Sequence, residues 1–250
     1  MADRQFTPIY AIGDIHGQHD MLLDALTMIE ADGGAAARVV VLGDLVDRGP
    51  DSRAVLDTLI AGRAQGRDWI VLRGNHDRMF LDFLESAQLD NPLIRSREVR
   101  SSGLGWLHEV MGGAATLASY DVDPTLPLPQ LLAATRQAVP QAHLDLLRGC
   151  PLYHIEGHLL FVHAGIHPEL PLDWQTEDQL CWIREPFLEH EQPFDWLVVH
   201  GHTAIETPRH YGNRINLDSG AGWNRPLTAA AIEGAKAWVL SPKGRLPLEP

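Results

Sequence analysis

The chain has 250 residues, which is enough for one large hydrophobic core or two small ones, and its 45% hydrophobic content is typical of a globular protein. A formal net charge of −13 argues against broad electrostatic binding to nucleic acid, because that mode of binding depends on clustered Lys and Arg. No window reaches the roughly 18 apolar residues of a membrane span, and "MADRQFTPIYAIGD" has no apolar signal core, so we expect a cytoplasmic protein without an obligate partner.

The first 85 residues repeat one pattern three times: a short apolar strand, a polar loop and an amphipathic helix. The strands and loops are "IYAIGDIHG", "RVVVLGDLVDRG" and "DWIVLRGNHDRMFLDFL", and the first two helices are expected over 19–32 and 52–66. Continuous apolar strands that alternate with helices predict an α/β fold with strands buried on both faces.

The pattern changes between Leu81 and Gly149, where the sequence is mostly helical or irregular. Prolines in "VDPTLPLPQLLAATRQAV" mark a connection before another amphipathic helix. We interpret residues 81–149 as a helical insertion or lid within a single domain over 1–250. Strand patterns then return, and the last two of them predict a hairpin; they cover residues 158–166, 196–203, 214–221, 227–234 and 235–241.

Five of the predicted strands end in loops that contain Asp, His or Asn. In open α/β sheets, loops at the carboxyl ends of strands converge on one ligand site. Each motif alone has an ordinary structural explanation, because Gly-Asp turns and partnered histidines are common. Together they place the same ligand types at the same end of the same element: Asp14, His16, Asp44, Asn75, His76, His163, His200 and His202.

Carboxylate, imidazole and amide ligands suit Mn²⁺, Fe or Zn²⁺ better than a dedicated Mg²⁺ or Ca²⁺ cage. The two cysteines, Cys150 and Cys181, lack metal-type spacing and are predicted to be buried and reduced. The ligands outnumber those that one tetrahedral ion needs, which predicts two divalent transition metal ions with Asp44 as the bridging carboxylate. Such a pair would make hydroxide from water near neutral pH and would reconcile an acidic chain with a phosphate substrate.

The ordered motifs "GDIHG", "GDLVDRG", "GNHD", "HAG" and "GHT", with "NLDSGA" and a terminal hairpin after them, extend over nearly the whole chain. This set resembles the calcineurin-like metallophosphoesterase superfamily, and within it the phosphoprotein phosphatases that include bacterial and phage serine/threonine phosphatases. The resemblance implies a four-layer αββα sandwich of two mixed β-sheets flanked by helices.

The resemblance also implies a role for each matching residue. Asp14 and His16 would bind the first metal and Asp44 would bridge, whereas the second metal would be bound by Asn75, His163 and His202. His76 would be the general acid that protonates the leaving oxygen, with Asp47 orienting its ring.

Substrate phosphate would contact Arg48, Asn75 and Arg184, although Arg184 in "LCWIREPF" rests on a shorter motif and could be a surface residue after Trp182. The family usually has Glu at the position of Asp77, which we expect to support its loop without binding metal. Arg73 either adds positive potential or pairs with an acid. We expect His200 to support the ligands, and Trp223 could line the cleft.

The leading functional hypothesis is hydrolysis of phosphate monoesters, on phosphoserine or phosphothreonine and potentially phosphotyrosine of proteins, by direct attack of a dimetal-bound hydroxide. Mn²⁺ is the first choice of metal, with Fe or Zn²⁺ as alternatives. The closest rival is a symmetrical bis(5'-nucleosyl)-tetraphosphate hydrolase with the same metal centre. The remaining alternative is an inactive module that binds a phosphorylated ligand.

Overall fold

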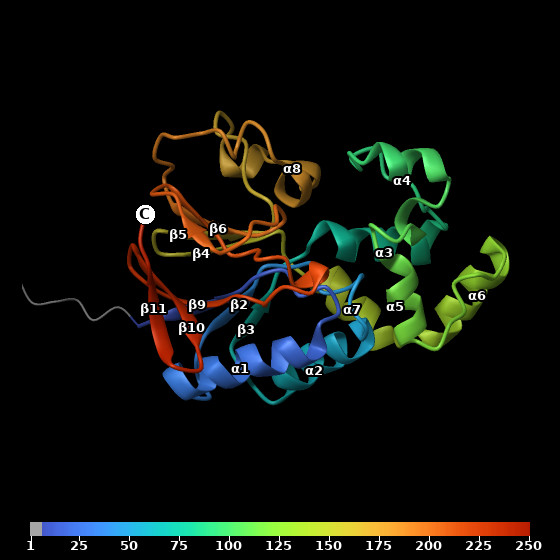
Figure 1. Ribbon diagram of the computed structural model, residues 1–250, viewed down its shortest axis with the longest axis horizontal. Coiled ribbons are helices and arrows are strands. Elements are labelled where there is room, and N and C mark those ends of the chain that lie inside the picture. Colours follow the sequence, from blue (N-terminus) through green and yellow to red (C-terminus); the bar gives the residue numbers. More distant parts are fainter. Residues whose placement is uncertain (1–6) are drawn as a thin grey trace, which may run out of the picture.

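The computed structural model describes residues 7–250, so the N-terminal expectation for residues 1–6 lies outside the described part. Two β-sheets pack face to face (Figure 1). The six-stranded sheet has the order β11-β10-β9-β1-β2-β3, and the five-stranded sheet has the order β4-β5-β6-β8-β7. The strands are β1 Ile9–Ile12, β2 Val39–Val41, β3 Trp69–Val71, β4 Tyr153–Glu156, β5 Leu159–Val162, β6 Leu197–His200, β7 Arg209–His210, β8 Arg214–Asn216, β9 Ala229–Glu233, β10 Lys236–Ser241 and β11 Gly244–Leu248.

Both sheets are mixed. Strands β1, β2 and β3 are parallel, and β9 runs antiparallel to β1, with Ala11 opposite Ala230. In the second sheet β5, β6 and β8 are parallel, whereas β4 and β7 are antiparallel at its two edges. The predicted fold of two mixed sheets is therefore confirmed, as is the antiparallel pairing of β9 with β10. Strands β4, β7 and β11 were not predicted.

The helices cover the outer faces of the sheets. Helices α1 and α2 lie along the six-stranded sheet, α8 lies beyond the five-stranded sheet, and α4 to α6 extend to one side (Figure 1). The α-helices are α1 His19–Gly33, α2 Ser52–Ala64, α3 Asn75–Ser86, α4 Arg97–Ser102, α5 Gly113–Ser119, α6 Leu128–Ala138, α7 Gln141–Gly149 and α8 Glu177–Trp182. Short 3-10 helices lie at Gly105–Leu107, Leu172–Trp174 and Ala221–Trp223.

Alternation along the strands places the core in layers. Ala11 and Val40 point into the cluster between the sheets, where they meet Phe161 and Ile215 of the second sheet. Their neighbours in sequence, such as Ile12, point outward into the cluster beneath α1 and α2. The central strands therefore bury both faces, which is why their sequences are continuously apolar.

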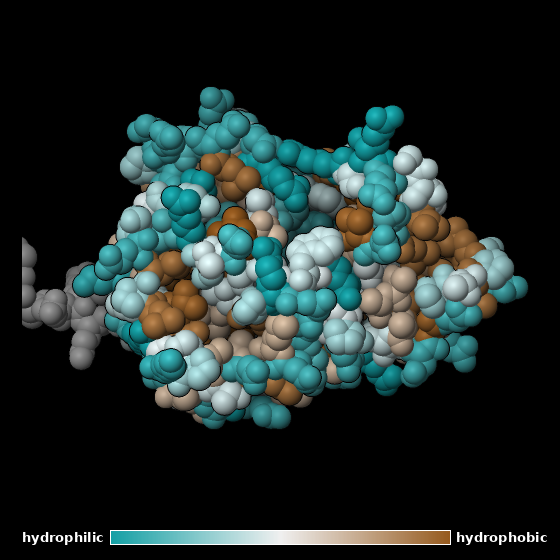
Figure 2. Space-filling view, in the orientation of Figure 1, coloured by the Kyte–Doolittle hydropathy of each residue, from teal (hydrophilic) through white to brown (hydrophobic). Residues whose placement is uncertain are grey.

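Helix α3 runs on to Ser86, so the additional helices begin later than the predicted boundary at Leu81. The segment between α3 and β4 holds α4 to α7. Figure 2 shows apolar residues gathered over this segment, which includes the half-exposed Leu104. Among the helices of residues 7–250, none is long and apolar enough to cross a membrane.

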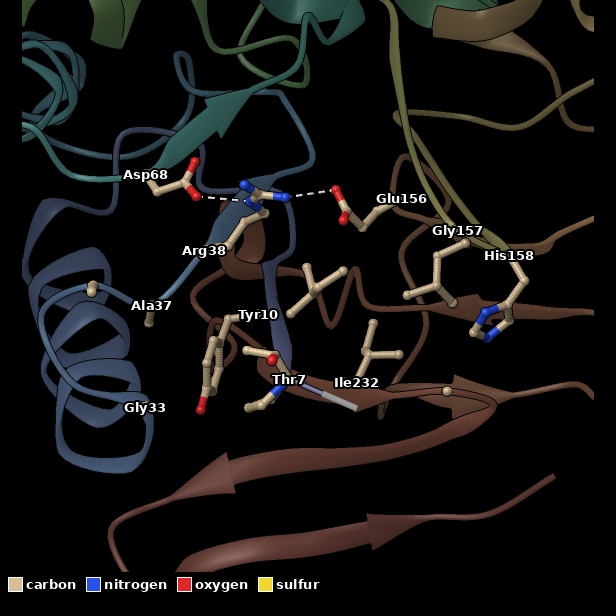
Figure 3. A pocket seen from close by; sticks show the side chains of 15 residues that line it. Thr7, Tyr10, Gly33, Ala37, Arg38, Asp68, Glu156, Gly157, His158 and Ile232 are labelled. Atoms are coloured by element: carbon tan, nitrogen blue, oxygen red, sulfur yellow. Dashed lines mark hydrogen bonds and ion pairs between the residues drawn. The ribbon is translucent and has the colours of Figure 1, made fainter. Parts of the chain in front are cut away.

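An ion-pair bridge joins the two sheets at the amino ends of the parallel strands (Figure 3). The Arg38 guanidinium donates to Asp68 through Nε (2.7 Å) and to Glu156 of the other sheet through Nη1 (2.7 Å). A cavity of about 710 Å³ opens beside it. Two carboxylates already balance the charge of Arg38, and the candidate metal-ligating groups of the described chain lie elsewhere.

Candidate active site

The structure brings the predicted ligands together at the opposite end, where the parallel strands finish. Asp14 and His16 follow β1, Asp44 follows β2, and His163 follows β5. All the proposed ligands are buried, with at most 9% of each residue exposed: Asp14, His16, Asp44, Asn75, His163 and His202. Segments nearly 190 residues apart in sequence meet here, since the backbone N–H of His202 donates to both Asp14 carboxylate oxygens (3.2 and 3.0 Å).

Asp44 lies at the centre of the cluster. Its Oδ2 is 3.5 Å from His16 Nε2, and its Oδ1 is 3.4 Å from His163 Nε2. It belongs to two groups of potential ligand atoms, each within 4.8 Å: one with His16 and His76, the other with His163 and His202. One carboxylate therefore faces two sets of imidazoles, which is the geometry expected of a bridging ligand.

Asn75 faces the second group. Its Oδ1 lies 2.9 Å from His163 Nε2 and 2.8 Å from His202 Nδ1. Helix α3 begins at Asn75, so the first turn of the helix carries this amide and the His76 imidazole into the site. Asp14 belongs to neither of the two compact groups, and His76, predicted to be the acid, falls within the first.

Backbone carbonyls fix the orientation of two imidazoles. His16 Nδ1 lies 3.0 Å from the Val46 carbonyl, and His163 Nδ1 lies 2.8 Å from the Leu42 carbonyl. A carbonyl accepts only from N–H, so Nδ1 carries the proton in both rings. Each Nε2 then carries a lone pair that can bind a cation, as in many protein metal sites.

The electrostatics of the cluster fit bound cations. Burial raises the pKa of Asp44 to about 7, and burial together with Asp218 raises the pKa of Asp14 well above its usual value. Burial lowers the pKa of His163 to about 4, so its imidazole is neutral near pH 7. Among residues 7–250, His202 Nε2 is a buried atom without a hydrogen-bond partner. Crowded carboxylates and neutral imidazoles need positive charge, and divalent ions supply it.

The loops of the site hold unusual backbone conformations. Five of its residues have positive φ although none is glycine: His16, Asp44, Asp47, Arg48 and His202. Glycine is required where chains approach a ligand closely, because a Cβ on Gly201 would lie 1.9 Å from Asp14 Oδ1. Such conformations cost about 1–3 kcal/mol each and cluster at functional sites.

Asp47 and His76 form a buried pair. His76 Nδ1 is 2.7 Å from Asp47 Oδ2, so the structure brings these two predicted site residues together. Two residues that sequence reasoning missed also donate to this carboxylate: Trp106 through Nε1 (2.7 Å) and Thr116 through Oγ1 (2.6 Å). Burial raises the pKa of Asp47, whereas the bonds from Thr116 and Trp106 act to lower it.

Arg48 lies over the cluster. Its Nη1 is 2.6 Å from His16 Nε2, its Nη2 is 3.0 Å from His76 Nε2, and its guanidinium stacks on Trp223 at 4.5 Å. A cavity of about 340 Å³ opens beside Arg48, and Arg184 and Trp223 also line it. Arg95 lines it too, was not predicted, and pairs with Glu185 at 2.7 Å.

The motif neighbours have supporting contacts. Asp77 accepts from the backbone N–H groups of Leu45 (2.9 Å) and Gly74 (2.8 Å), so it holds the loops as expected. Arg73 pairs with Glu177 at 3.0 Å, which favours the ion-pair interpretation. The His200 ring packs edge-on against Phe187, with centroids 5.0 Å apart, on the side of the second sheet that packs under α8.

Comparison with known proteins gives the class. The family model for calcineurin-like phosphoesterases matches residues 7–228. An asymmetrical bis(5'-nucleosyl)-tetraphosphatase, PrpE, of Anoxybacillus flavithermus is 26% identical, with 87% of each chain covered. Serine/threonine-protein phosphatase 1 of Salmonella typhimurium is also 26% identical, with 90% of this chain and 92% of that protein covered. A crystal structure described as a candidate diadenosine tetraphosphatase has a TM-score of 0.65 at 23% identity and covers 100% of this chain and 96% of its own.

The fold and the cluster thus define a metal-dependent hydrolase of phosphoesters. The chain belongs to the calcineurin-like phosphoesterase family. The predicted family and enzyme class, a dinuclear metal-dependent phosphoesterase, are confirmed, and divalent metal ions are the cofactors of this family.

Proposed function

We propose that the protein hydrolyses phosphate monoesters, with phosphoserine and phosphothreonine side chains of proteins as the first substrate class and phosphotyrosine as a further one. The observation that carries the proposal is the sharing of Asp44 between two groups of imidazoles, next to the Asp47–His76 pair and Arg48. When bound, two divalent ions, Mn²⁺ first and Fe or Zn²⁺ as alternatives, supply Lewis-acid activation of water and of the phosphoryl oxygens.

The protein residues divide the remaining work. Asp14, His16 and Asp44 would hold one ion, and Asp44 with Asn75, His163 and His202 would hold the other. Arg48 and Arg184 would bind phosphate oxygens, for which a planar guanidinium is well matched. Asn75 lines the same cavity and would also contact the phosphate.

His76 would donate the proton to the leaving oxygen. In this structure its Nε2 faces the Arg48 guanidinium, and burial and the positive charge of Arg48 lower the pKa of His76. A phosphate dianion in the site adds negative charge and draws Arg48 toward itself, and both changes favour a protonated Nε2. As the P–O bond breaks, its electron pair goes to the leaving oxygen, which takes the Nε2 proton. Water provides the oxygen and one hydrogen of the new P–OH group, and its other proton is released to solvent, which balances the reprotonation of His76.

A second candidate substrate is a dinucleoside tetraphosphate. It is favoured by Arg95 and Arg184, two cations that line the same cavity, and by apolar residues such as Ile94 and Met111 that line it too. A phosphate chain with a nucleoside attached would meet both kinds of side chain. Tetraphosphatase names and a protein phosphatase name both occur among the relatives of this chain, so the comparisons fit both classes.

The test is a substrate panel with the Mn²⁺-loaded protein. Phosphoserine, phosphothreonine and phosphotyrosine peptides, 4-nitrophenyl phosphate and diadenosine tetraphosphate are compared by kcat/KM. We expect peptide phosphates to be the best substrates. Two ADP molecules from the dinucleotide at higher kcat/KM would favour the symmetrical tetraphosphatase, and ATP with AMP the asymmetrical one. Metal binding without turnover of any substrate would refute the proposal and indicate a binding module.

A further inference from the structure

Two residues of the helical segment reach the acid pair from a distance in the sequence. Trp106 lies in the 3-10 helix before α5, and Thr116 lies within α5, 59 and 69 residues after Asp47. Trp106, Thr116 and Asp47 are each fully buried, at 0% exposure. A hydrogen bond to a buried carboxylate is charge-assisted and is roughly twice as strong as a neutral one.

The contacts fix both oxygens of the Asp47 carboxylate. Oδ2 accepts from Trp106 Nε1 and from His76 Nδ1, each at 2.7 Å, whereas Oδ1 accepts from Thr116 Oγ1 at 2.6 Å. The Thr116 oxygen also accepts from the backbone N–H of Asp47 at 2.8 Å. Thr116 therefore holds the main chain and the side chain of one residue, whose φ of 76° is strained.

Trp106 is itself held by the helix that carries His76. Its ring stacks on Phe80 with centroids 5.5 Å apart and contacts Phe83 at 5.1 Å, and both phenylalanines belong to α3. The contacts form a closed circuit: α3 supports Trp106, Trp106 and Thr116 hold Asp47, and Asp47 orients His76 at the start of α3. Small displacements of either element would move the imidazole.

We propose that Trp106 and Thr116 are positioning residues for proton donation, which they serve by holding the Asp47 carboxylate against His76. The inference rests on the proposed function, in which His76 is the general acid. The alternative is a purely structural role, in which the two residues only satisfy the hydrogen-bonding needs of a buried carboxylate. These roles differ in one measurable respect. An impaired general acid slows the hydrolysis of a substrate with a poor leaving group more than that of a substrate whose leaving group departs without a proton.

The experiment uses the Mn²⁺-loaded protein and two substrates of different leaving-group quality. Trp106→Phe removes the Nε1–H and keeps a ring, and Thr116→Val removes the hydroxyl and keeps the shape. We expect kcat on 4-nitrophenyl phosphate, whose leaving group needs little protonation, to stay within about threefold of the original protein. We expect kcat on a phosphoserine peptide to fall about 10–100-fold, part of the 10²–10⁴ that a general acid contributes, with KM and bound Mn²⁺ unchanged.

Matched controls come from the same chain. Thr135→Val removes another fully buried hydroxyl of the helical segment, which donates to the Leu131 carbonyl at 2.8 Å. Trp69→Phe alters a tryptophan of β3 that packs on Gly62. Neither control substitution should change the ratio of kcat on the phosphoserine peptide to kcat on 4-nitrophenyl phosphate. Thr116→Ser retains the hydroxyl and should restore that ratio, even if Thr116→Val folds poorly.

Three outcomes separate the possibilities. A selective loss with the phosphoserine peptide supports the inference. The inference is overturned if Trp106→Phe lowers kcat equally on both substrates or lowers neither. This conclusion requires that His76→Asn does show the selective loss. If His76→Asn itself lacks that selectivity, the role of His76 in the proposed function has failed first, and the inference falls with it.

Discussion

Replacement of His76 with Asn removes the proposed proton donor while leaving the carboxylates of the cluster in place. The imidazole is 2% exposed and is held by Asp47 at 2.7 Å, and that carboxylate is fixed in turn by Trp106 and Thr116. Positioned general acids contribute about 10²–10⁴ to the rate. Because His76 is oriented on a rigid carboxylate, we expect the upper part of this range for a phosphoserine peptide. A fall in kcat of about 10³–10⁴ corresponds to about 4–5.5 kcal/mol at 1.36 kcal/mol for each factor of ten.

The assay pairs steady-state kinetics with metal analysis of the dialysed protein. KM should change by less than about threefold, because the phosphate contacts are assigned to the arginines. His143→Asn is the control, since His143 is also buried but bonds to Tyr120 and Asp57 away from the site. Loss of a metal ion from His76→Asn would refute the assignment: His76 would then be a ligand, as its place within 4.8 Å of Asp44 and His16 allows.

Four further predictions address the cluster and the scaffold. Asp44→Asn should release both metal ions, measured by elemental analysis, whereas loss of one ion would contradict a bridging role. Phe161→Ala, at a fully buried position between the sheets, should lower the free energy of unfolding by about 3–5 kcal/mol in urea titrations. Trp174 is 72% exposed, so Trp174→Ala should change the free energy of unfolding by less than about 0.5 kcal/mol. Burial lowers the pKa of His200 to about 3. As the pH falls below 6.5, the ordinary pKa of histidine, this residue therefore binds a proton in the unfolded chain but not in the folded chain. The protein should therefore lose about 1.6 kcal/mol of unfolding free energy relative to His200→Leu between pH 6.5 and 5, and equal pH dependence in both would exclude this source.

The central strands could be predicted because each is buried on both faces. Three to five apolar residues in a row between polar loops identify β1, β2, β5, β6 and β9. The missed strands lie at sheet edges and have mixed sequences, such as "YHIE" of β4 and "GRLPL" of β11. Edge strands depend on pairing with a neighbour more than on their own pattern, and β7, with only two residues, has no pattern to detect.

The candidate ligands could be predicted because glycine-flanked motifs mark the loops at strand ends. The supporting residues carry no such mark. Trp106 is one of seven tryptophans and has the surroundings of an ordinary core residue, and Thr116 lies in a helix of small side chains. Arg95 was missed for a related reason, since a lone arginine before a short helix is usually solvated. Only the folded chain shows that Trp106 and Thr116 reach the loop after β2 and that Arg95 lines the cavity beside it.

The strained loop after β2 depends on distant segments for its shape. Asp44, Asp47 and Arg48 all have positive φ, which a short polar loop would not keep by itself. The Arg48 backbone N–H donates to the Gly112 carbonyl at 3.2 Å, and Arg48 Nε donates to the Val110 carbonyl at 3.2 Å. Gly112 cannot carry a side chain here, because a Cβ would lie 2.3 Å from the Arg48 nitrogen. The residues between α4 and α5 therefore help to set the conformation of the loop after β2, which we propose binds phosphate, and they support this loop through their hydrogen bonds with Arg48.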